Sequence, residues 1–503
     1  MLNWIESRTG FVSMAKDFLV EDIPGGASYW YVFGSATIFA MILQIVTGIF
    51  LTFFYAPSAN TAWESTAWIY THYWPHLILS IHYWGASAMI ALVFLHLLQV
   101  LVWGAYKSPR ELQWVVGVIL LLITLVLGLT GYLLPWDMNA YFASQVSLNI
   151  TGTAPIAGSF IQQLAQGGGA MGTETINRFF GIHVWLMPAV MVALVGAHLA
   201  IFRWNGPAGP VTEDPRTLKN GRFWPDQMFM DGFASFIVFA IVVALALISP
   251  PFLDAKADPT NATFIPYPAW YFLSLFGLLN LVPPSLDLLA TIIVPTLFLL
   301  LVLAVPWLDR STTRSLAARG GIIFSTVVVL AVIVGLSLFS QISIQAKQAK
   351  APPSPTEAQV LAAALATAAP TAVSPPTSSN APPASGSVAA SAANPLVAAG
   401  APVFASSCAG CHGATGLGMP GAIPPLAGNP YVTGDANAVI GTVLTGLHSK
   451  IVVEGVSYNG QMPAWKGALS NKDIAAVISY IRGGLGKNTA SAVSVAQVAA
   501  YKP

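Results

Sequence analysis

The stretch SIHYWGASAMIALVFLHLLQV (residues 80–100) decides the fold, because it is apolar and long enough to cross a bilayer. It nevertheless carries two histidines, His82 and His96, fourteen positions apart. In an α-helix fourteen residues rise about 21 Å, and fourteen steps of roughly 100° return to within about 40° of the same face. Ionisable or metal-binding side chains inside membrane helices are costly and usually functional. The two imidazoles therefore mark functional positions at two depths on one side of this helix.

A second apolar stretch, GIHVWLMPAVMVALVGAHL (residues 181–199), repeats the pattern with His183 and His198, which are fifteen positions apart. Both stretches are expected to cross the membrane in the same direction, so His82 lies level with His183, and His96 with His198. Two imidazoles at one depth are suited to be the axial ligands of a haem iron. The sequence therefore predicts two bis-histidine haem sites stacked through the bilayer.

Glycines on two neighbouring helices follow the same interval. Gly34 and Gly48 lie fourteen apart in one apolar run, and Gly117 and Gly131 lie fourteen apart in another. A glycine lets a flat macrocycle approach the backbone, but it equally lets two helices approach one another. For one isolated histidine, simple hydrogen bonding within the bundle is the better explanation. Four histidines at matched depths, with glycines at the same interval, favour haem binding, and we expect these glycines to pack against the haems.

The composition is that of a membrane protein. Of 503 residues, 55% are hydrophobic and 8% are charged, and the mean hydropathy is +0.67. The net charge of +1 gives no indication of nucleic acid or of a charged substrate. Seven apolar runs are long enough to span a bilayer. They cover residues 31–55, 77–104, 113–135, 181–203, 229–250, 286–307 and 320–342.

Basic residues between the runs predict the orientation. The N-terminal segment and residues 105–112, 203–228 and 308–319 contain eleven lysines and arginines, whereas residues 56–76, 136–180 and 251–285 contain two. Positively charged loops stay on the cytoplasmic side. The N-terminus is therefore expected inside, and everything after residue 342 outside.

The two cysteines of the chain, Cys408 and Cys411, both lie in CAGCHG (residues 408–413). A CxxC pair alone would suit a redox dithiol or half of a zinc site, but the histidine that follows makes this a haem c attachment motif. We expect thioether bonds from both cysteines and His412 as the proximal ligand. The sequence thus predicts a covalent haem c near the C-terminus.

The sixth ligand of this haem is predicted to be Met462, within NGQMPAW (residues 459–465). The MPAW sequence ahead of a terminal helix resembles that of class I cytochromes c, and a Met/His axial pair favours a high potential. Met419 lies only seven residues after His412, too near to reach across the haem comfortably. His448 is a lesser alternative.

The expected architecture is all-α, with five parts. An amphipathic surface segment is expected at residues 1–28, with no cleavable signal peptide. A four-helix dihaem domain follows, then a three-helix domain, an Ala/Pro/Ser-rich flexible linker and a small α-helical cytochrome c domain. These four parts are expected at residues 29–228, 229–344, 345–395 and 396–503.

The first 342 or so residues resemble cytochrome b of the Rieske/cytochrome bc family, the quinol:cytochrome c or plastocyanin oxidoreductases. The resemblance implies that His82 and His183 ligate an outer, low-potential haem b, and His96 and His198 an inner, high-potential one. The fifteen-residue interval and the seven spans are closer to the chloroplast and cyanobacterial type, in which the dihaem subunit and subunit IV are separate chains. The matching stretches are LQIVTG (43–48), HYWGAS (82–87), KSPREL (107–112), GYLLPWD (131–137) and RFFGIHVWLMP (178–188).

The same resemblance places a quinol oxidation site in FIPYPAWYFLSLFGLL (residues 264–279). The family carries Pro-Glu-Trp-Tyr there, and its glutamate is thought to accept a quinol proton. This chain has Pro268-Ala269-Trp270-Tyr271, and an alanine accepts no proton. Asp254, Asp258, Tyr271 or ordered water are alternative acceptors. If none serves, the alternative function is a membrane electron conduit that links another redox enzyme to haem c without quinol oxidation.

Family positions imply further site residues. Val32 stands where chloroplast-type relatives carry a cysteine that holds an extra covalent haem, so no such haem is expected. For the haem propionates the candidates are Arg178 at the outer site and Arg110 or Lys107 at the inner site, although a purely topogenic role is equally compatible. The candidates for the inner quinone site are Arg203 and Asp226.

The resemblance also implies partners. The chain has no motif with paired Cys and His ligands for a Rieske cluster, so a Rieske iron–sulfur protein is expected as a separate subunit of a dimeric, proton-translocating complex. The expected cofactors are two haems b and one haem c. The expected substrate is menaquinol or a similar quinol, and the acceptor a soluble or membrane-bound periplasmic protein. The fusion of b and c parts indicates a prokaryotic cytoplasmic membrane.

Overall fold

The computed structural model describes two compact units, Met1–Ala369 and Pro370–Pro503. It describes every residue of the chain except 1, 11, 14–15, 17–18, 212–218, 262–263, 351–354, 357, 363–394, 409–411, 414–415, 419–422, 448–450, 454–455, 459–461, 463, 468, 487 and 502–503. Both units are built from helices, with two short antiparallel strand pairs, β1–β2 (Asp22–Ile23 with Gly221–Arg222) and β3–β4 (Ile451–Val453 with Val456–Tyr458). The all-α prediction is confirmed.

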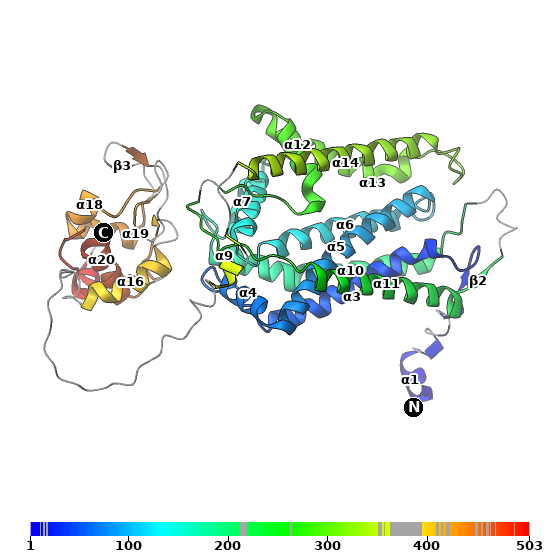
Figure 1. Ribbon diagram of the computed structural model, residues 1–503, viewed down its shortest axis with the longest axis horizontal. Coiled ribbons are helices and arrows are strands. Elements are labelled where there is room, and N and C mark those ends of the chain that lie inside the picture. Colours follow the sequence, from blue (N-terminus) through cyan, green and yellow to red (C-terminus); the bar gives the residue numbers. More distant parts are fainter. Residues whose placement is uncertain are drawn as a thin grey trace. The chain divides into compact units, whose positions relative to one another are not determined.

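Seven helices of the first unit are long and apolar enough to span a membrane, as predicted (Figure 1). Within the bundle α3 packs on α5, α6 on α10, and α11 against both α3 and α5. The fourth span begins earlier than expected, and the seventh continues to Gln348. The spans are η1–α3 (Tyr29–Thr52), α5 (Tyr73–Val102), α6 (Glu111–Tyr132), α9–η2–α10 (Thr173–Asn205), η4–α11 (Phe223–Ile248), η7–α13 (Leu289–Leu308) and α14 (Gly320–Gln348).

Short helices gather at one end of the bundle, which we call the cap end. Aromatic and aliphatic side chains of α4, α7, α9 and the intervening loops form one buried cluster there, the cap cluster, which includes Trp63, Trp136, Tyr141, Phe179 and Leu253. The cap elements are α4 (Ala62–Thr71), α7 (Met138–Gly152), α8 (Gly158–Gln166), η5 (Trp270–Phe272), α12 (Leu273–Leu281) and η6 (Pro284–Leu286).

The cap also joins the first four spans of the chain to the last three. Met138 N donates to the Ala255 carbonyl (2.8 Å), and Ala257 N donates to the Trp136 carbonyl (3.1 Å). Trp63 Nε1 donates to the carbonyl of Asp254 (3.0 Å). These bonds fix the segment after α11 against the segment after α6.

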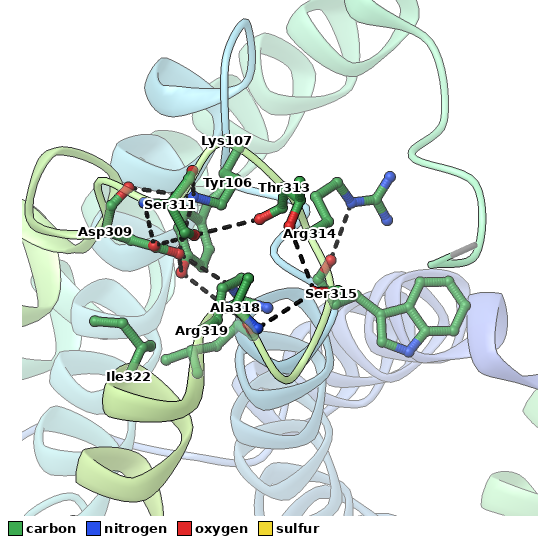
Figure 2. Close-up of polar contacts among 12 residues, drawn as sticks. Tyr106, Lys107, Asp309, Ser311, Thr313, Arg314, Ser315, Ala318, Arg319 and Ile322 are labelled. Carbon is green, nitrogen blue, oxygen red and sulfur yellow. Dashed lines mark hydrogen bonds and ion pairs between the residues drawn. The ribbon is translucent and has the colours of Figure 1, made fainter. Parts of the chain in front are cut away.

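The opposite end, which we call the clamp end, contains a buried ionic cluster between the α5–α6 loop and the α13–α14 loop (Figure 2). The side chain of Arg319 is fully buried, and its Nε lies 2.9 Å from Asp309 Oδ2. Lys107 Nζ lies 3.0 Å from the same oxygen, and the Tyr106 hydroxyl donates to it (2.6 Å). Arg319 also donates to the Leu101 and Val102 carbonyls (2.5 and 2.8 Å), the uncapped end of α5.

The second unit is a small helical domain. Helix α16 (Pro395–Ser407) packs on α20 (Asn471–Gly483), and Phe404, Ile440, Ile474 and Ile478 are buried in its core. The other helices that the structure describes in this unit are α18 (Pro430–Thr433), α19 (Ala436–Thr445) and α21 (Val495–Ala500). The predicted linker lies mostly outside the described residues, but Val360 of its first part is buried in the cap cluster.

Removal of the buried guanidinium should destabilise the clamp end. Burial opposes ionisation of Asp309, but hydrogen bonds from Ser311, Tyr106, Arg319 and Lys107 hold its pKa well below the usual range. We expect Arg319→Met to cost about 3 kcal/mol, because it leaves a buried carboxylate without its principal partner. Thermal unfolding in detergent measures the loss.

The matched control is Arg310→Met, since Arg310 is exposed and borders the same loop. An equal loss of thermal stability in the two variants would show that the cluster contributes nothing specific. Because the pKa of Asp309 is lowered in the folded state, its stabilising effect should disappear as the pH falls below about 4.

Candidate functional site

Two of the four predicted ligands meet at the cap end of the bundle. His82 on α5 and His183 on η2 (Ile182–Leu186) have ring centroids 6.3 Å apart and planes inclined by 76°. With metal–nitrogen bonds of about 2 Å, two imidazoles on opposite sides of one iron have ring centres roughly 6 Å apart. A Cβ on Gly48 would lie 3.3 Å from the His82 ring, and one on Gly131 would lie 2.6 Å from the His183 ring.

The other two ligands lie toward the clamp end. His96 on α5 and His198 on α10 (Met187–Asn205) are close enough to interact electrostatically. A Cβ on Gly34 would approach the His96 ring to 3.4 Å, and a Cβ on Gly117 would approach the His198 ring to 3.4 Å. Each of the four predicted glycines thus faces one histidine, and each level holds two histidines and two glycines.

The unequal intervals of fourteen and fifteen residues have a structural cause. Residues 182–186, which include His183, form a π-helical turn ahead of Pro188. A π-turn accommodates one residue more than the corresponding α-helical turn. The extra residue on this helix is absorbed there, so His183 stays level with His82 while His198 stays level with His96.

Threonine hydroxyls orient the two cap-end histidines. Thr47 Oγ1 lies 2.9 Å from His82 Nδ1, and Thr130 Oγ1 lies 3.2 Å from His183 Nδ1. Each threonine directly precedes its glycine, at Thr47-Gly48 and Thr130-Gly131. Sequence reasoning missed these residues, although the repeated Thr-Gly pair was a visible signal.

The residues fit haem rather than a bare metal ion. Within the part of the chain that the structure describes, no three or more His, Cys, Asp or Glu side chains gather as a bare ion would require. Two imidazoles per level leave the other coordination positions to a macrocycle, and the glycines keep side chains away from that space. In this arrangement His82 and His183 would hold one haem, and His96 and His198 the other.

A cavity of about 220 Å³ opens at the cap end and includes most of the predicted quinol site. Pro268, Ala269 and Tyr271 line it, together with residues of α6, α7 and α12. Trp270 is not among the lining residues; it is half-exposed, and its Nε1 donates to Ser87 Oγ on α5 (3.3 Å). The structure therefore brings three of the four motif residues to one cavity.

The Tyr271 side chain is fitted against a glycine of α6. A Cβ on Gly128 would lie 2.7 Å from the Tyr271 hydroxyl, closer than side chains approach one another. Gly128 lies one turn from Gly131, which faces His183. The phenol of Tyr271 and the imidazole of His183 thus pack on neighbouring turns of the same helix, and the cavity lies beside the cap-end histidine pair.

Polar groups of the cavity wall connect to the cap. Tyr132 lines the cavity, and its hydroxyl accepts a short hydrogen bond from the Asn139 side chain. The side-chain oxygen of Asn139, Oδ1, accepts a hydrogen bond from Tyr267 N (3.0 Å), and Tyr267 also lines the cavity. Burial raises the pKa of Tyr267 to about 12, and the charges of Asp137 and Asp254 add to the effect.

Asp137, which sequence reasoning did not select, is a buried carboxylate of the cap. It is the N-cap of α7, where Oδ1 accepts from Ala140 N (2.8 Å) and Oδ2 accepts from Asp254 N (3.3 Å). Burial raises the pKa of Asp137 to about 6, and the charge of Asp254 adds to the effect. Burial also raises the pKa of Asp254. Asp258 is bonded to the backbone and hydroxyl of Thr260.

The basic residues predicted for the propionates bind protein carbonyls. Arg178 donates to the carbonyls of Gln163 and Leu164, near the end of α8. Arg110 donates to the Asn205 and Gly206 carbonyls at the end of α10. In these contacts both arginines bind carbonyl groups at the C-terminal end of a helix.

The predicted residues of the inner quinone site, Arg203 and Asp226, lie at the clamp end. Arg203 forms an ion pair with Glu21, and Asp226 is exposed. Sequence reasoning missed Asp231 on α11, an intramembrane carboxylate that accepts a hydrogen bond from Gln227 (2.8 Å) and lies near the Ser35 side chain. Ser35 directly follows Gly34, so Asp231 lies near the clamp-end histidines.

In the second unit His412 is buried, and its Nδ1 donates to the Pro424 carbonyl (3.0 Å), which leaves Nε2 for a metal. Burial lowers the pKa of His412, and this hydrogen bond opposes that shift. Cys408 is half-buried, and Met462 packs against the hydrophobic core and pairs with the Leu447 backbone. Cys411, Met419 and His448 lie outside the described residues.

Three protein families match successive parts of the chain. They are described as cytochrome b(N-terminal)/b6/petB over residues 87–255, cytochrome b(C-terminal)/b6/petD over residues 256–362, and cytochrome c oxidase, cbb3-type, subunit III over residues 395–481. The order of these matches agrees with the order of the parts predicted from the sequence.

Individual proteins show the same likeness. A cytochrome bc complex cytochrome b subunit of Chlorobaculum thiosulfatiphilum is 34% identical over 317 residues, 62% of this chain and 74% of that protein. A menaquinol:cytochrome c reductase cytochrome b subunit of Bacillus subtilis (strain 168) is 38% identical over 218 residues, 42% of this chain and 97% of that protein. A solved structure named hyperthermophilic respiratory Complex III aligns with a TM-score of 0.61 at 26% identity and covers 73% of this chain and 95% of that one.

A methyl group at position 131 should disrupt the cap-end histidine pair. Because the added Cβ would lie 2.6 Å from the His183 ring, we expect Gly131→Ala to displace that imidazole and to lower the non-covalent haem content by about half. Gly196→Ala is the matched control, since nothing lies within 4 Å of a Cβ there. Haem b per polypeptide, measured by pyridine haemochrome absorbance, tests this; equal content in the two variants would contradict it.

Proposed function

The chain belongs to the cytochrome b family, as the b subunit of a bc-type quinol:cytochrome c reductase complex, and we propose that it oxidises quinol in the cavity at the cap end and carries electrons in two directions from there. The observation that supports this most strongly is the position of the cavity beside the cap-end histidine pair, with the second pair beyond it. When bound, the haems accept and pass on single electrons. One path leads to the clamp end, and the other leads through a Rieske protein to the haem c domain.

The residues of the cavity bind and orient the quinol. Its wall is mostly apolar and suits the ring and the hydrocarbon tail. The hydroxyls of Tyr132 and Tyr271 supply polar contacts on the side of α6. Since the segment after α11 is bonded to the segment after α6, the cap also keeps water from the ring.

The proton acceptor has to differ from the family's glutamate, because Ala269 lines the cavity where that residue would stand. We propose Asp137 as the acceptor, in place of the sequence-based candidates Asp254, Asp258 and Tyr271. Its raised pKa lets it accept a proton near neutral pH and release it again. It interacts electrostatically with both Tyr132 and Tyr267, which line the cavity.

At the clamp end we propose reduction of a second quinone beside the inner haem. Asp231 is the candidate proton donor, because intramembrane carboxylates are usually functional; Gln227 donates a hydrogen bond to it, and Ser35 lies beside it. Arg203 and Asp226 remain candidates for the entry of protons from the aqueous side. The excess of basic residues in the clamp-end loops supports a cytoplasmic clamp end and an outer cap end.

Several partners follow from this proposal. Both cysteines belong to the CxxCH motif, so a Rieske cluster has to come from another subunit. The second unit, tethered to the bundle, would take the place of a separate cytochrome c and pass electrons to a periplasmic acceptor. We further propose menaquinol or a similar quinol as the substrate, proton translocation across a prokaryotic membrane, and a dimeric complex.

A redox titration of the purified complex, followed by its visible absorbance, tests the proposal. We expect two b-type centres and one c-type centre per polypeptide, all reduced by a menaquinol analogue in a reaction that outer-site inhibitors block. A single b-type centre would contradict the paired histidines. A full set of haems that quinol cannot reduce would favour the alternative function, an electron conduit that serves another redox enzyme, for which the presence of Ala269 is the supporting observation.

Asp137→Asn tests the acceptor, because asparagine still caps α7 but binds no proton. We expect quinol oxidation at pH 7 to fall about tenfold, with the haem content unchanged. In the unaltered protein turnover should decline as the pH falls below about 6, where Asp137 is protonated, and this decline should be absent from the residual activity of the variant. Asp258→Asn is the control; equal turnover in the two variants would exclude Asp137.

A further inference from the structure

The hydroxyls of Thr47 and Thr130 have their protons committed to the backbone. Thr47 Oγ1 donates to the Leu43 carbonyl (2.7 Å), and Thr130 Oγ1 donates to the Val126 carbonyl (2.9 Å). A hydroxyl has one proton to give. Each oxygen can therefore only accept from the histidine beside it, which places a proton on Nδ1 of that imidazole.

This arrangement sets the chemistry of the cap-end ligands. With the proton on Nδ1, the Nε2 lone pairs of His82 and His183 are free to bind iron. An imidazole whose N–H is accepted by an oxygen is a stronger electron donor to its metal. Stronger donation stabilises the ferric state over the ferrous state, so these two hydrogen bonds would lower the reduction potential of a haem held there.

The clamp-end histidines have no equivalent hydroxyls. The residues that precede Gly34 and Gly117 are Phe33 and Val116. His183 also lies near the Leu127 backbone. At the clamp end His96 lies near the Gln99 side chain, and His198 lies near the Gln113 backbone. Neither clamp-end contact has hydrogen-bond geometry, so in the part of the chain that the structure describes the Nδ1 atoms of His96 and His198 are buried without a partner.

We propose that Thr47 and Thr130 are positioning residues that lower the potential of the cap-end haem below that of the clamp-end haem. The inference rests on the haem ligation put forward under the proposed function. It assigns a direction to the two sites from their own side chains: an electron that enters at the cap end moves energetically downhill toward the clamp end. Phe33 and Val116 occupy the equivalent positions at the clamp end and offer no hydrogen-bond acceptor, so only the cap-end histidines receive this stabilisation.

The experiment is a potentiometric titration of the b-type centres in the whole complex, with optical and electron paramagnetic resonance detection. The variants are Thr47→Val, Thr130→Val and the double variant, because valine keeps the shape of threonine and removes the acceptor. We expect the double variant to reduce the equilibrium constant for electron transfer from the cap-end to the clamp-end haem about tenfold. For a one-electron couple this corresponds to a rise of about 59 mV in the cap-end potential.

Thr124→Val is the matched control. Thr124 is buried on α6 and donates to the Leu120 carbonyl (2.9 Å) like Thr130, but no histidine is bonded to it. Its substitution should leave both potentials unchanged. If the valine variants lose haem, Thr47→Ser and Thr130→Ser are titrated instead, and these should keep the potentials of the unaltered protein.

Three results decide the matter. Potentials in the double valine variant equal to those of Thr124→Val would overturn the inference, as would serine variants that retain haem but shift like valine. A shift of the clamp-end potential instead would also contradict it. Absence of two b-type centres from the unaltered complex would refute the proposed function itself, so the two failures are distinguishable.

Discussion

The proposed haem ligation requires two imidazoles to lie at the same depth in the bilayer, and the rest of the bundle is arranged to meet this condition at two levels. One ligand helix separates its histidines by fourteen residues and the other by fifteen, so two regular helices would bring only one pair level. The π-turn at residues 182–186 removes the difference. Glycines on the two facing helices then leave room beside all four rings.

The two ends of the bundle are held together by different means. At the clamp end a buried arginine and aspartate connect the first four spans with the last three, and the arginine also binds the free carbonyls at the end of α5. At the cap end backbone hydrogen bonds and aromatic packing do the same. The ionic cluster tolerates little change because it is buried, whereas the cap surrounds a cavity that a ligand has to enter.

The fold and the pairing of the four histidines at two levels were accessible from the sequence because both depend on periodicity. Apolar runs gave seven spans, and the interval between His82 and His96 gave two depths. The residues that were missed act through contacts that no periodicity reveals. In the sequence Asp137 is recognisable only as a helix N-cap, and its burial depends on contact with the loop after α11. Asp231 can be selected only when its neighbours Ser35 and Gln227 are known. Likewise the Arg110 and Arg178 contacts with helix-end carbonyls depend on where α8 and α10 end.

The fit of Tyr271 against Gly128 has a consequence for chemical inhibition. A compound that fills the cavity contacts Tyr271, and there is no free space between the Tyr271 ring and Gly128 behind it. Even a methyl group at position 128 would collide with the phenol. A resistance substitution at position 128 is therefore not tolerated. Resistance to such a compound has to arise at lining residues that have free space around them.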